Sequence, residues 1–522
     1  MTVVMTQHRH AKKLKITLLL AVLITVIASV VAFISIATLN NTLQIQRVAS
    51  QNQAQAEIDL ALGSQDGFEL PDNTSYIPEP LDEATLVEVI AKNQPAVVRL
   101  VTVLCVDISL VSAESSFTID DACGGGVGTG SIISRDGYIA TNGHVVTITP
   151  KQALATSLSD NETIQSYLEH IVEAGYITTA RANTIIAAIN DESPSVESLL
   201  SQTIQSIPDT TVQTSDVTTQ HAVQLSNEPV RVQSINNRIG IELTDTVVDA
   251  RLIDQDYDAV TSDQSLATGQ FTTSDVAILK AEGDYPYVTL GSITGIGRGD
   301  QLTAIGFPAF VDGSLDTDAW QTVPSITQGE VKEVLKDADV NGRNILSTTV
   351  PIAQGNSGGP SFNDQGEQIG INTYSDLKCE DLKCFGDGLV RDIDDLKVLL
   401  RKNNIILATG GVTDDWHRGL DAFVEGDYPQ ALAAFEEVKD QYPSNYVVSP
   451  LALAAREQVG GANDSSTTLQ TRTVTIAILT AVGIVTLLII VTLIILIIYL
   501  NRRHIRTLRR EADSRPPSPN DL

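Results

Sequence analysis

Three short motifs, and their order along the chain, constrain the fold most strongly. Thr-Asn-Gly-His-Val-Val at residues 141–146 places a histidine directly after a strand-like segment. Ser-Asp-Val-Ala-Ile-Leu-Lys at residues 274–280 opens a hydrophobic strand with an aspartate. Gly-Asn-Ser-Gly-Gly-Pro at residues 355–360 sets a serine among glycines, which let the backbone turn tightly and point N–H groups at a carbonyl. Because a serine needs a neighbouring base to act as a nucleophile, the motifs predict one site built from three distant segments.

The order histidine, aspartate, serine is that of chymotrypsin-fold proteases and differs from the orders of subtilisins and α/β-hydrolases. Residues 96–402 resemble the HtrA/Deg branch of the trypsin-like serine proteases. Besides the three motifs, the resemblance rests on residues 128–133, 137–142, 299–301, 305–308 and 366–373. It implies a mainly β fold, with two six-stranded antiparallel β-barrels that share a cleft.

The resemblance implies a serine endopeptidase, a hydrolase of peptide bonds, with a catalytic triad. His144 would accept the proton of Ser357 as general base, and Asp275 would hold the imidazole tautomer. The backbone N–H groups of Gly355 and Ser357 would form the oxyanion hole. Plainer alternatives are a structural role for His144, a strand cap at Asp275, and a serine in a relative that has lost its activity.

Substrate preference in this fold depends on residues just before the serine and in the hairpin after it. The substrate-pocket residues that we expect are Ile352, Ala353, Gln354, Asn372, Thr373 and Tyr374. Neither stretch has an acidic residue to receive Lys or Arg, so we expect a small or medium aliphatic side chain at the cleavage position. Asp376 and Asp387 would reverse this expectation if their side chains turned inward.

Two segments without charged residues, 16–39 and 474–500, exceed the ~20 residues that a helix needs to cross a bilayer. They predict two transmembrane helices. A signal peptide is the alternative for the first, although its apolar stretch is longer than the usual ~7–15 residues. A buried helix of a soluble domain is the alternative for the second. Basic residues precede the first and follow the second, which predicts cytoplasmic termini and a protease domain outside the cell membrane.

The formal net charge of −30 excludes a typical nucleic-acid-binding protein, which would be basic. No metal-binding pattern or nucleotide fingerprint stands out, and the triad mechanism requires no cofactor. We therefore expect no cofactor, no metal and no nucleic acid. The expected partners are protein or peptide substrates and the lipid bilayer.

The four cysteines fit an extracytoplasmic location, where an even count suggests disulfides. Local pairing, Cys105 with Cys123 and Cys379 with Cys384, is favoured among three connectivities. A zinc site formed by all four is the alternative, although the spacings lack a C-x-x-C knuckle. By the resemblance, the second pair lies in a loop that borders the substrate pocket.

The interval between His144 and Asp275 is longer than the family usually needs. Residues 150–219 therefore look like an insertion, and apolar residues at helical spacing from residue 161 predict helices there. Ser-Pro-Ser at residues 193–195 predicts the start of a further helix that runs to residue 207. A lid over the cleft and a passive surface element are both compatible with this pattern.

HtrA-type enzymes usually carry a PDZ domain after the protease domain, and this chain differs there. Residues 412–460 look like one helical hairpin of tetratricopeptide (TPR) type. The pattern rests on Gly419, residues 426–428, Ala431, Phe435 and Pro443. Because one repeat is too short for independent stability, we expect it to pack on the protease domain or to bind a protein partner. A plain helical spacer is the alternative.

The expected organisation is a cytoplasmic N-terminus (1–15), transmembrane helix (16–39), stalk (40–80), protease domain (81–405), TPR-like segment (412–460), linker (461–473), transmembrane helix (474–500) and basic cytoplasmic tail (501–522). The resemblance implies a membrane-tethered serine endopeptidase that cleaves extracytoplasmic proteins, in protein quality control by family analogy. The alternatives are a protease-like scaffold that binds through the helical hairpin, and a regulated signalling protease.

Overall fold

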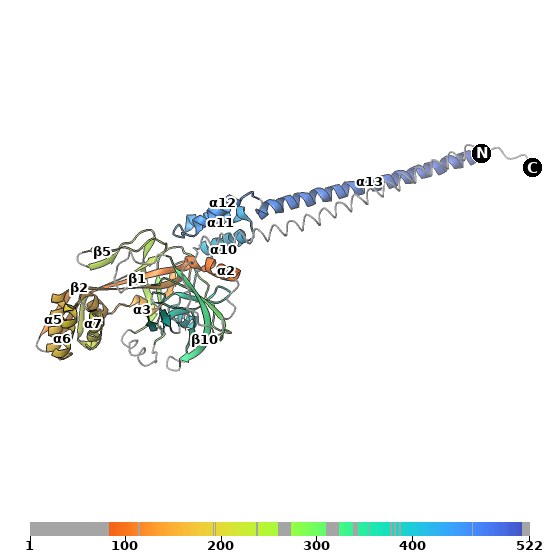
Figure 1. The fold of residues 1–522 in the computed structure, drawn as a ribbon. Helices are drawn as coiled ribbons and strands as arrows, with labels where there is room; N and C mark the ends of the chain where they lie inside the picture. Colours follow the sequence, from red (N-terminus) through yellow and green to blue (C-terminus); the bar gives the residue numbers. More distant parts are fainter. Residues whose placement is uncertain are drawn as a thin grey trace, which may run out of the picture. The chain divides into compact units, whose positions relative to one another are not determined.

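The computed structural model describes residues 83–513 except 113–114, 192, 194, 236–237, 259–272, 309–322, 338–342, 354, 376–377, 381–382, 386–387 and 462 (Figure 1). The expected N-terminal transmembrane helix and stalk therefore lie outside the described residues. The described chain falls into two compact units. The first runs to Phe423 and includes Gln430–Arg456, and the second comprises Val424–Pro429 and the chain from Glu457 onward.

The first unit begins with α2 (Glu83–Asn93) and contains two closed barrels. The first barrel has the strand order β1 (Val97–Val111), β2 (Ser116–Ile132), β3 (Tyr138–Thr141), β8 (Val276–Lys280), β7 (Val247–Asp256) and β4 (Val212–Gln224). All pairings between these strands are antiparallel. A separate hairpin pairs β5 (Val232–Ile235) with β6 (Arg238–Ile241).

The second barrel has the order β10 (Ser325–Asp337), β11 (Arg343–Thr348), β16 (Gly388–Asp392), β13 (Gln368–Ser375), β12 (Pro360–Phe362) and β9 (Gln301–Gly306). A small hairpin pairs β14 (Lys378–Glu380) with β15 (Lys383–Phe385), and α9 (Ile393–Lys402) follows β16. The expectation of two six-stranded antiparallel barrels is confirmed. In the described part of the chain, closure pairs each barrel strand with a neighbour on both sides.

Three strands of the first barrel extend into a long arm. The β1–β2 pairing continues to Val111↔Ser116, and β4 joins β1 as early as Leu110↔Val212. β4 therefore begins inside residues 150–219, the stretch assigned to the insertion.

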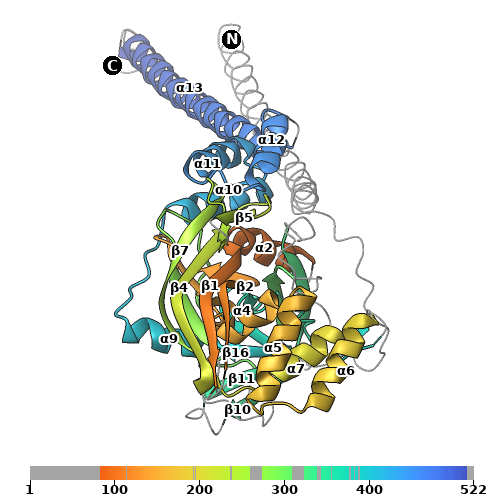
Figure 2. The same cartoon turned by 90° about the vertical axis from the view of Figure 1, so that its left-hand side faces the viewer.

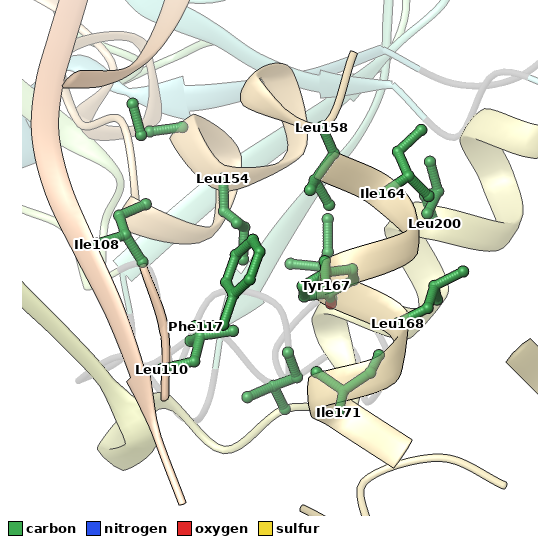
Figure 3. Close-up of a cluster of buried hydrophobic side chains, with 14 of the residues drawn as sticks. Ile108, Leu110, Phe117, Leu154, Leu158, Ile164, Tyr167, Leu168, Ile171 and Leu200 are labelled. Atoms are coloured by element: carbon green, nitrogen blue, oxygen red, sulfur yellow. The ribbon is translucent and has the colours of Figure 1, made fainter. Parts of the chain in front are cut away.

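Four helices occupy the inserted stretch: α4 (Pro150–Ser157), α5 (Asn161–Glu173), α6 (Thr179–Asn190) and α7 (Val196–Gln205). The first begins with a capping box at Thr149, which satisfies free N–H groups, and with Pro150, which has no N–H to satisfy. Figures 1 and 2 show α5, α6 and α7 beside one another at the end of the β1–β2 arm. Arm residues Ile108, Leu110 and Phe117 form one apolar core with these helices (Figure 3). The helices thus cover the apolar face of strands that have left the barrel.

Three helices follow the second barrel: α10 (Val412–Val424), α11 (Tyr428–Gln441) and α12 (Val448–Gln458). Tyr442 donates its hydroxyl to the carbonyl oxygen of Leu225 at 3.2 Å, and Gln94 Nε2 donates to the hydroxyl of Tyr446 at 2.6 Å. The helical segment therefore packs on the barrel unit, which is one of the two outcomes expected for it. Its assignment to the TPR type stays a prediction.

The second unit consists mainly of α13 (Ser465–Asp513). Within the described residues, one stretch is long and apolar enough to cross a membrane, at Leu487–Thr507. It overlaps the expected span at 474–500. Because this test uses length and composition alone, membrane anchoring stays a prediction.

Candidate active site

Adjacent strands bring His144 and Asp275 together. The histidine lies in the short helix α3 (Gly143–Val146) directly after β3, and the aspartate directly precedes β8, which pairs with β3. One carboxylate oxygen of Asp275 accepts the backbone N–H of His144 at 3.0 Å, and the other lies 2.8 Å from His144 Nδ1. The carboxylate thus contacts both the backbone and the ring of the same histidine.

The carboxylate of Asp275 is almost completely buried, with 2% of the side chain exposed. Burial raises the pKa of this carboxyl, but the charge of His144 and hydrogen bonds from His144 and Thr373 outweigh it, so the pKa lies below its usual range. The Thr373 hydroxyl donates to Asp275 Oδ2 at 2.7 Å. An ionised Asp275 favours a proton on His144 Nδ1 and leaves Nε2 as a proton acceptor.

Ser357 lies on a glycine turn that allows a very close approach between the barrels. Gly358 has φ +86°, and an added Cβ would lie 2.1 Å from Thr141 Oγ1 and 2.2 Å from the carbonyl oxygen of Thr129. Only glycine fits there. The Ser357 hydroxyl, which is partly exposed, donates to the carbonyl oxygen of Thr373 at 3.0 Å.

The serine turn is held by a threonine from the first barrel. Thr129 on β2 donates its hydroxyl to the carbonyl oxygen of Gly355 at 2.7 Å. It donates its N–H to the carbonyl oxygen of Ser357 at 2.9 Å. Among the described residues, no backbone carbonyl oxygen accepts the N–H of Gly355 or of Ser357. The assignment of these two N–H groups to an oxyanion hole stays a prediction.

The structure adds three residues to the site for which no role was expected: Thr129, Asn142 and Tyr257. The first two lie inside the sequence motifs. Asn142 Nδ2 donates to the carbonyl oxygen of Asp275 at 2.7 Å. The Tyr257 ring lies edge-on to the His144 ring, with 6.4 Å between centroids. An added Cβ on Gly143 would lie 2.1 Å from Cβ of Tyr257, so the glycine before the histidine makes room for this tyrosine.

The residues expected to line the substrate pocket lie in different surroundings. Ile352 is buried among apolar side chains of the second barrel, and the amide oxygen of Asn372 accepts the Ser361 hydroxyl at 2.6 Å. The Thr373 hydroxyl donates to the Asp275 carboxylate, as described above. Ala353 is partly exposed, while Gln354 and the side chain of Tyr374 lie outside the described part of the chain. The pocket assignment stays a prediction.

One of the two expected disulfides is confirmed. Cys105 on β1 is bonded to Cys123, its partner in the register with β2. Cys379 lies opposite Cys384 in the β14–β15 register, where the side chains are outside the described part, so that pairing stays a prediction. Within the described ranges, no group of three or more His, Cys, Asp or Glu residues could hold a metal ion.

Part of the barrel unit is similar to known proteins. A family model described as a trypsin-like peptidase domain matches residues 212–371, which contain Asp275 and Ser357. A probable periplasmic serine endoprotease DegP-like of Pseudomonas fluorescens is 38% identical over 102 residues, 19% of each chain. A protein of the same name from Halomonas elongata is 37% identical over 106 residues, 20% of each chain.

A mammalian protein is similar to the same degree. Serine protease HTR4 of Bos taurus is 37% identical over 102 residues, which cover 19% of this chain and 20% of the relative. The chain thus spans about a fifth of the length of the curated relatives it matches. It carries a trypsin-like peptidase domain and is a distant relative of the DegP/HtrA serine endoproteases.

Proposed function

We propose that this chain is a membrane-tethered serine endopeptidase that cleaves extracytoplasmic proteins with Ser357, His144 and Asp275. One observation carries the proposal. The buried carboxylate of Asp275 lies 2.8 Å from His144 Nδ1, and both residues belong to the barrel that packs against the serine turn. A structural histidine would not need a buried acid that contacts both its ring and its backbone N–H.

In the proposed reaction, the Ser357 oxygen attacks the carbonyl carbon of a peptide bond while His144 Nε2 takes the hydroxyl proton. The N–H groups of Gly355 and Ser357 stabilise the oxyanion, a contribution of roughly two to three orders of magnitude in rate per donor. His144 then gives the proton to the leaving amine, and water hydrolyses the acyl-enzyme by the reverse steps. Rotation of the Ser357 side chain away from the Thr373 carbonyl directs its proton to His144.

The membrane tether is the second part of the proposal. The uncharged segments at residues 16–39 and 474–500, the second of which overlaps the apolar stretch found in α13, would both cross the bilayer. Arginines at 502, 503, 506, 509 and 510 would keep the C-terminal end cytoplasmic. The peptidase unit between the two segments would then lie outside, as the word periplasmic in the relatives' names suggests. Unfolded or unassembled extracytoplasmic proteins are the substrates that we propose.

Catalysis is tested on the full chain in detergent, as wild type and Ser357→Ala. Both are incubated with a fluorophosphonate probe and with unfolded casein. We expect labelling and cleavage by the wild type and neither by the variant. If the folded wild type takes up no probe, the peptidase assignment is wrong, and the barrels act as a binding platform with the helical segment as its docking surface.

The tether is tested separately by washing membranes at alkaline pH, which releases peripheral proteins. We expect the full chain to stay in the membrane fraction. We also expect added protease to digest the barrel unit in intact spheroplasts. Release by the wash would contradict the tether, and protection from digestion would contradict the orientation.

A further inference from the structure

The backbone at Asp275 adopts a conformation that needs support from its surroundings. Its φ of +53° lies in the left-handed region, where residues other than glycine are uncommon. Such conformations persist only where neighbouring contacts determine them, and they gather at functional sites. The contacts that hold Ser274 and Asp275 therefore bear directly on the orientation of the carboxylate that contacts His144.

Asp256, the last residue of β7, holds this segment at three points. Its carbonyl oxygen accepts the N–H of Asp275 at 2.9 Å. Its carboxylate oxygen Oδ2 accepts the N–H of Ser274 at 3.2 Å and the Ser274 hydroxyl at 2.6 Å. Ser274 is fully buried. One residue thus fixes two successive peptide groups immediately before β8.

Asp256 is in turn held by the second barrel. Arg343, the first residue of β11, donates from Nη1 to the same Oδ2 atom at 2.6 Å. Its Nε lies 3.4 Å from a carboxylate oxygen of Asp395 on α9. Burial raises the pKa of the Asp256 carboxyl, but hydrogen bonds from Ser274 and Arg343 outweigh it, so the pKa is lowered and the acceptor stays ionised.

The ion pair is too exposed to act mainly through charge. Arg343 has 24% of its side chain exposed and Asp256 has 35%, so solvent screens the attraction. Its geometry is what matters, because Arg343 belongs to the barrel that carries Ser357 and Asp256 belongs to the barrel that carries His144 and Asp275. The contact therefore joins the two halves of the candidate site.

We propose that Asp256 and Arg343 are positioning residues, which fix the Ser274–Asp275 backbone and set the register between the two barrels at the proposed triad. Neither residue contacts the reacting atoms. They act through Asp275, whose carboxylate orients His144 and stabilises its protonated form. This inference rests on the proposed function, but the placement of the Asp275 segment is measurable without any activity.

The first measurement needs no activity. Hydrogen–deuterium exchange of the full chain in detergent is followed by mass spectrometry in a Ser357→Ala background, with Asp256→Ala added. We expect the peptide that covers residues 273–280 to exchange at least about tenfold faster, because removal of the charged acceptor frees the N–H and the hydroxyl of Ser274, which hold this segment. Exchange in the insertion helices α5, α6 and α7 stays unchanged. Unchanged exchange at residues 273–280 would refute the proposal whether or not the chain is a peptidase.

The second measurement is the pH profile of fluorophosphonate labelling with Ser357 intact. A displaced Asp275 carboxylate stabilises positive charge on the His144 ring less, so the pH of half-maximal labelling moves down. We expect Asp256→Ala to lower this midpoint and to slow labelling about 10- to 100-fold. We expect Arg343→Ala to lower the pH midpoint and the labelling rate by smaller amounts. Arg343→Lys restores part of the lost rate.

A purely structural role predicts a different pattern. It would slow labelling without moving the pH midpoint, and that result would overturn the proposal. Arg418→Ala is the matched control, because it removes an arginine that pairs with Asp415 and Glu437 far from the site in sequence. If Asp256→Ala does not fold, Asp256→Asn, which keeps one oxygen acceptor, and Arg343→Ala decide the question by the same midpoint.

Discussion

Trp416 is the side chain that most clearly ties the helical segment to the rest of the first unit. It lies on α10 with 1% of its surface exposed, and its indole N–H donates to the carbonyl oxygen of Ala91 on α2 at 2.8 Å. Its ring centroid lies 5.6 Å from that of Phe435 on α11. If the segment is an integral part of the folded unit, Trp416→Ala must destabilise the barrels as well as the helices.

The magnitude follows from two losses. Truncation of a buried tryptophan to alanine costs about 3–5 kcal/mol through lost burial and the cavity left behind. The carbonyl of Ala91 loses its partner, which adds about 1–3 kcal/mol if it stays buried. A sum of about 4–8 kcal/mol is a large part of the ~5–15 kcal/mol that stabilises a typical protein. Trp416→Phe keeps most of the apolar contact, so we expect a cost of about 1–3 kcal/mol from the hydrogen bond.

Urea unfolding of the full chain in detergent, measured by pulse proteolysis of the barrel unit, tests this expectation. The matched control is Leu453→Ala on α12, where the side chain is 56% exposed and the expected change is within about 0.5 kcal/mol. An unchanged midpoint of barrel unfolding in Trp416→Ala, with the helical segment alone becoming protease-sensitive, would refute the reasoning. The segment would then be a spacer that folds on its own.

Three further predictions concern the site. Gly358→Ala should prevent both native folding and fluorophosphonate labelling, because its Cβ would overlap Thr141. The control is Gly295→Ala, at φ +92° with open space around it, which should lower the free energy of urea unfolding by only about 1–2 kcal/mol. The lowered pKa of Asp275 makes its contribution to stability fully present above the unfolded carboxyl pKa of about 3.9, and lost as pH falls through the lower folded value. Urea unfolding below pH 4 should therefore depend less on pH in Asp275→Asn than in the wild type. Thr373→Val should slow labelling about tenfold or more by removing a donor to Asp275, while Thr373→Ser, which keeps the hydroxyl, should not.

The two barrels could be predicted because the motifs and their order carry the resemblance to the HtrA/Deg proteases, which implies that fold. His144 follows β3 and Asp275 precedes β8, so their approach required only that these strands pair. The start of β4 was not predictable in the same way. Residues 213–218 of that strand are exposed, and all of them except Val217 are polar, because they lie on the arm beyond the barrel core. Without apolar alternation, nothing in their sequence distinguishes them from the preceding insertion.

The surroundings of Thr373 illustrate a limit of a different kind. Side chains alternate between the two faces of a regular strand, so a pocket wall could be derived from sequence if the register were known. Here the pairing of β13 with β16 is irregular between Asn372 and Tyr374. A shift of one residue exchanges the two faces, and only the structure shows that the Thr373 hydroxyl donates to Asp275.

In the described part of the chain, three residues hold parts of the candidate site that belong to the opposite barrel. Thr129 of the first barrel holds the carbonyl of Gly355, and two residues of the second barrel, Thr373 and Arg343, hold Asp275 and Asp256. Each contact fixes a residue whose function depends on a partner in the opposite barrel. A small displacement between the barrels would therefore loosen the serine turn, the Asp275 carboxylate and its backbone together.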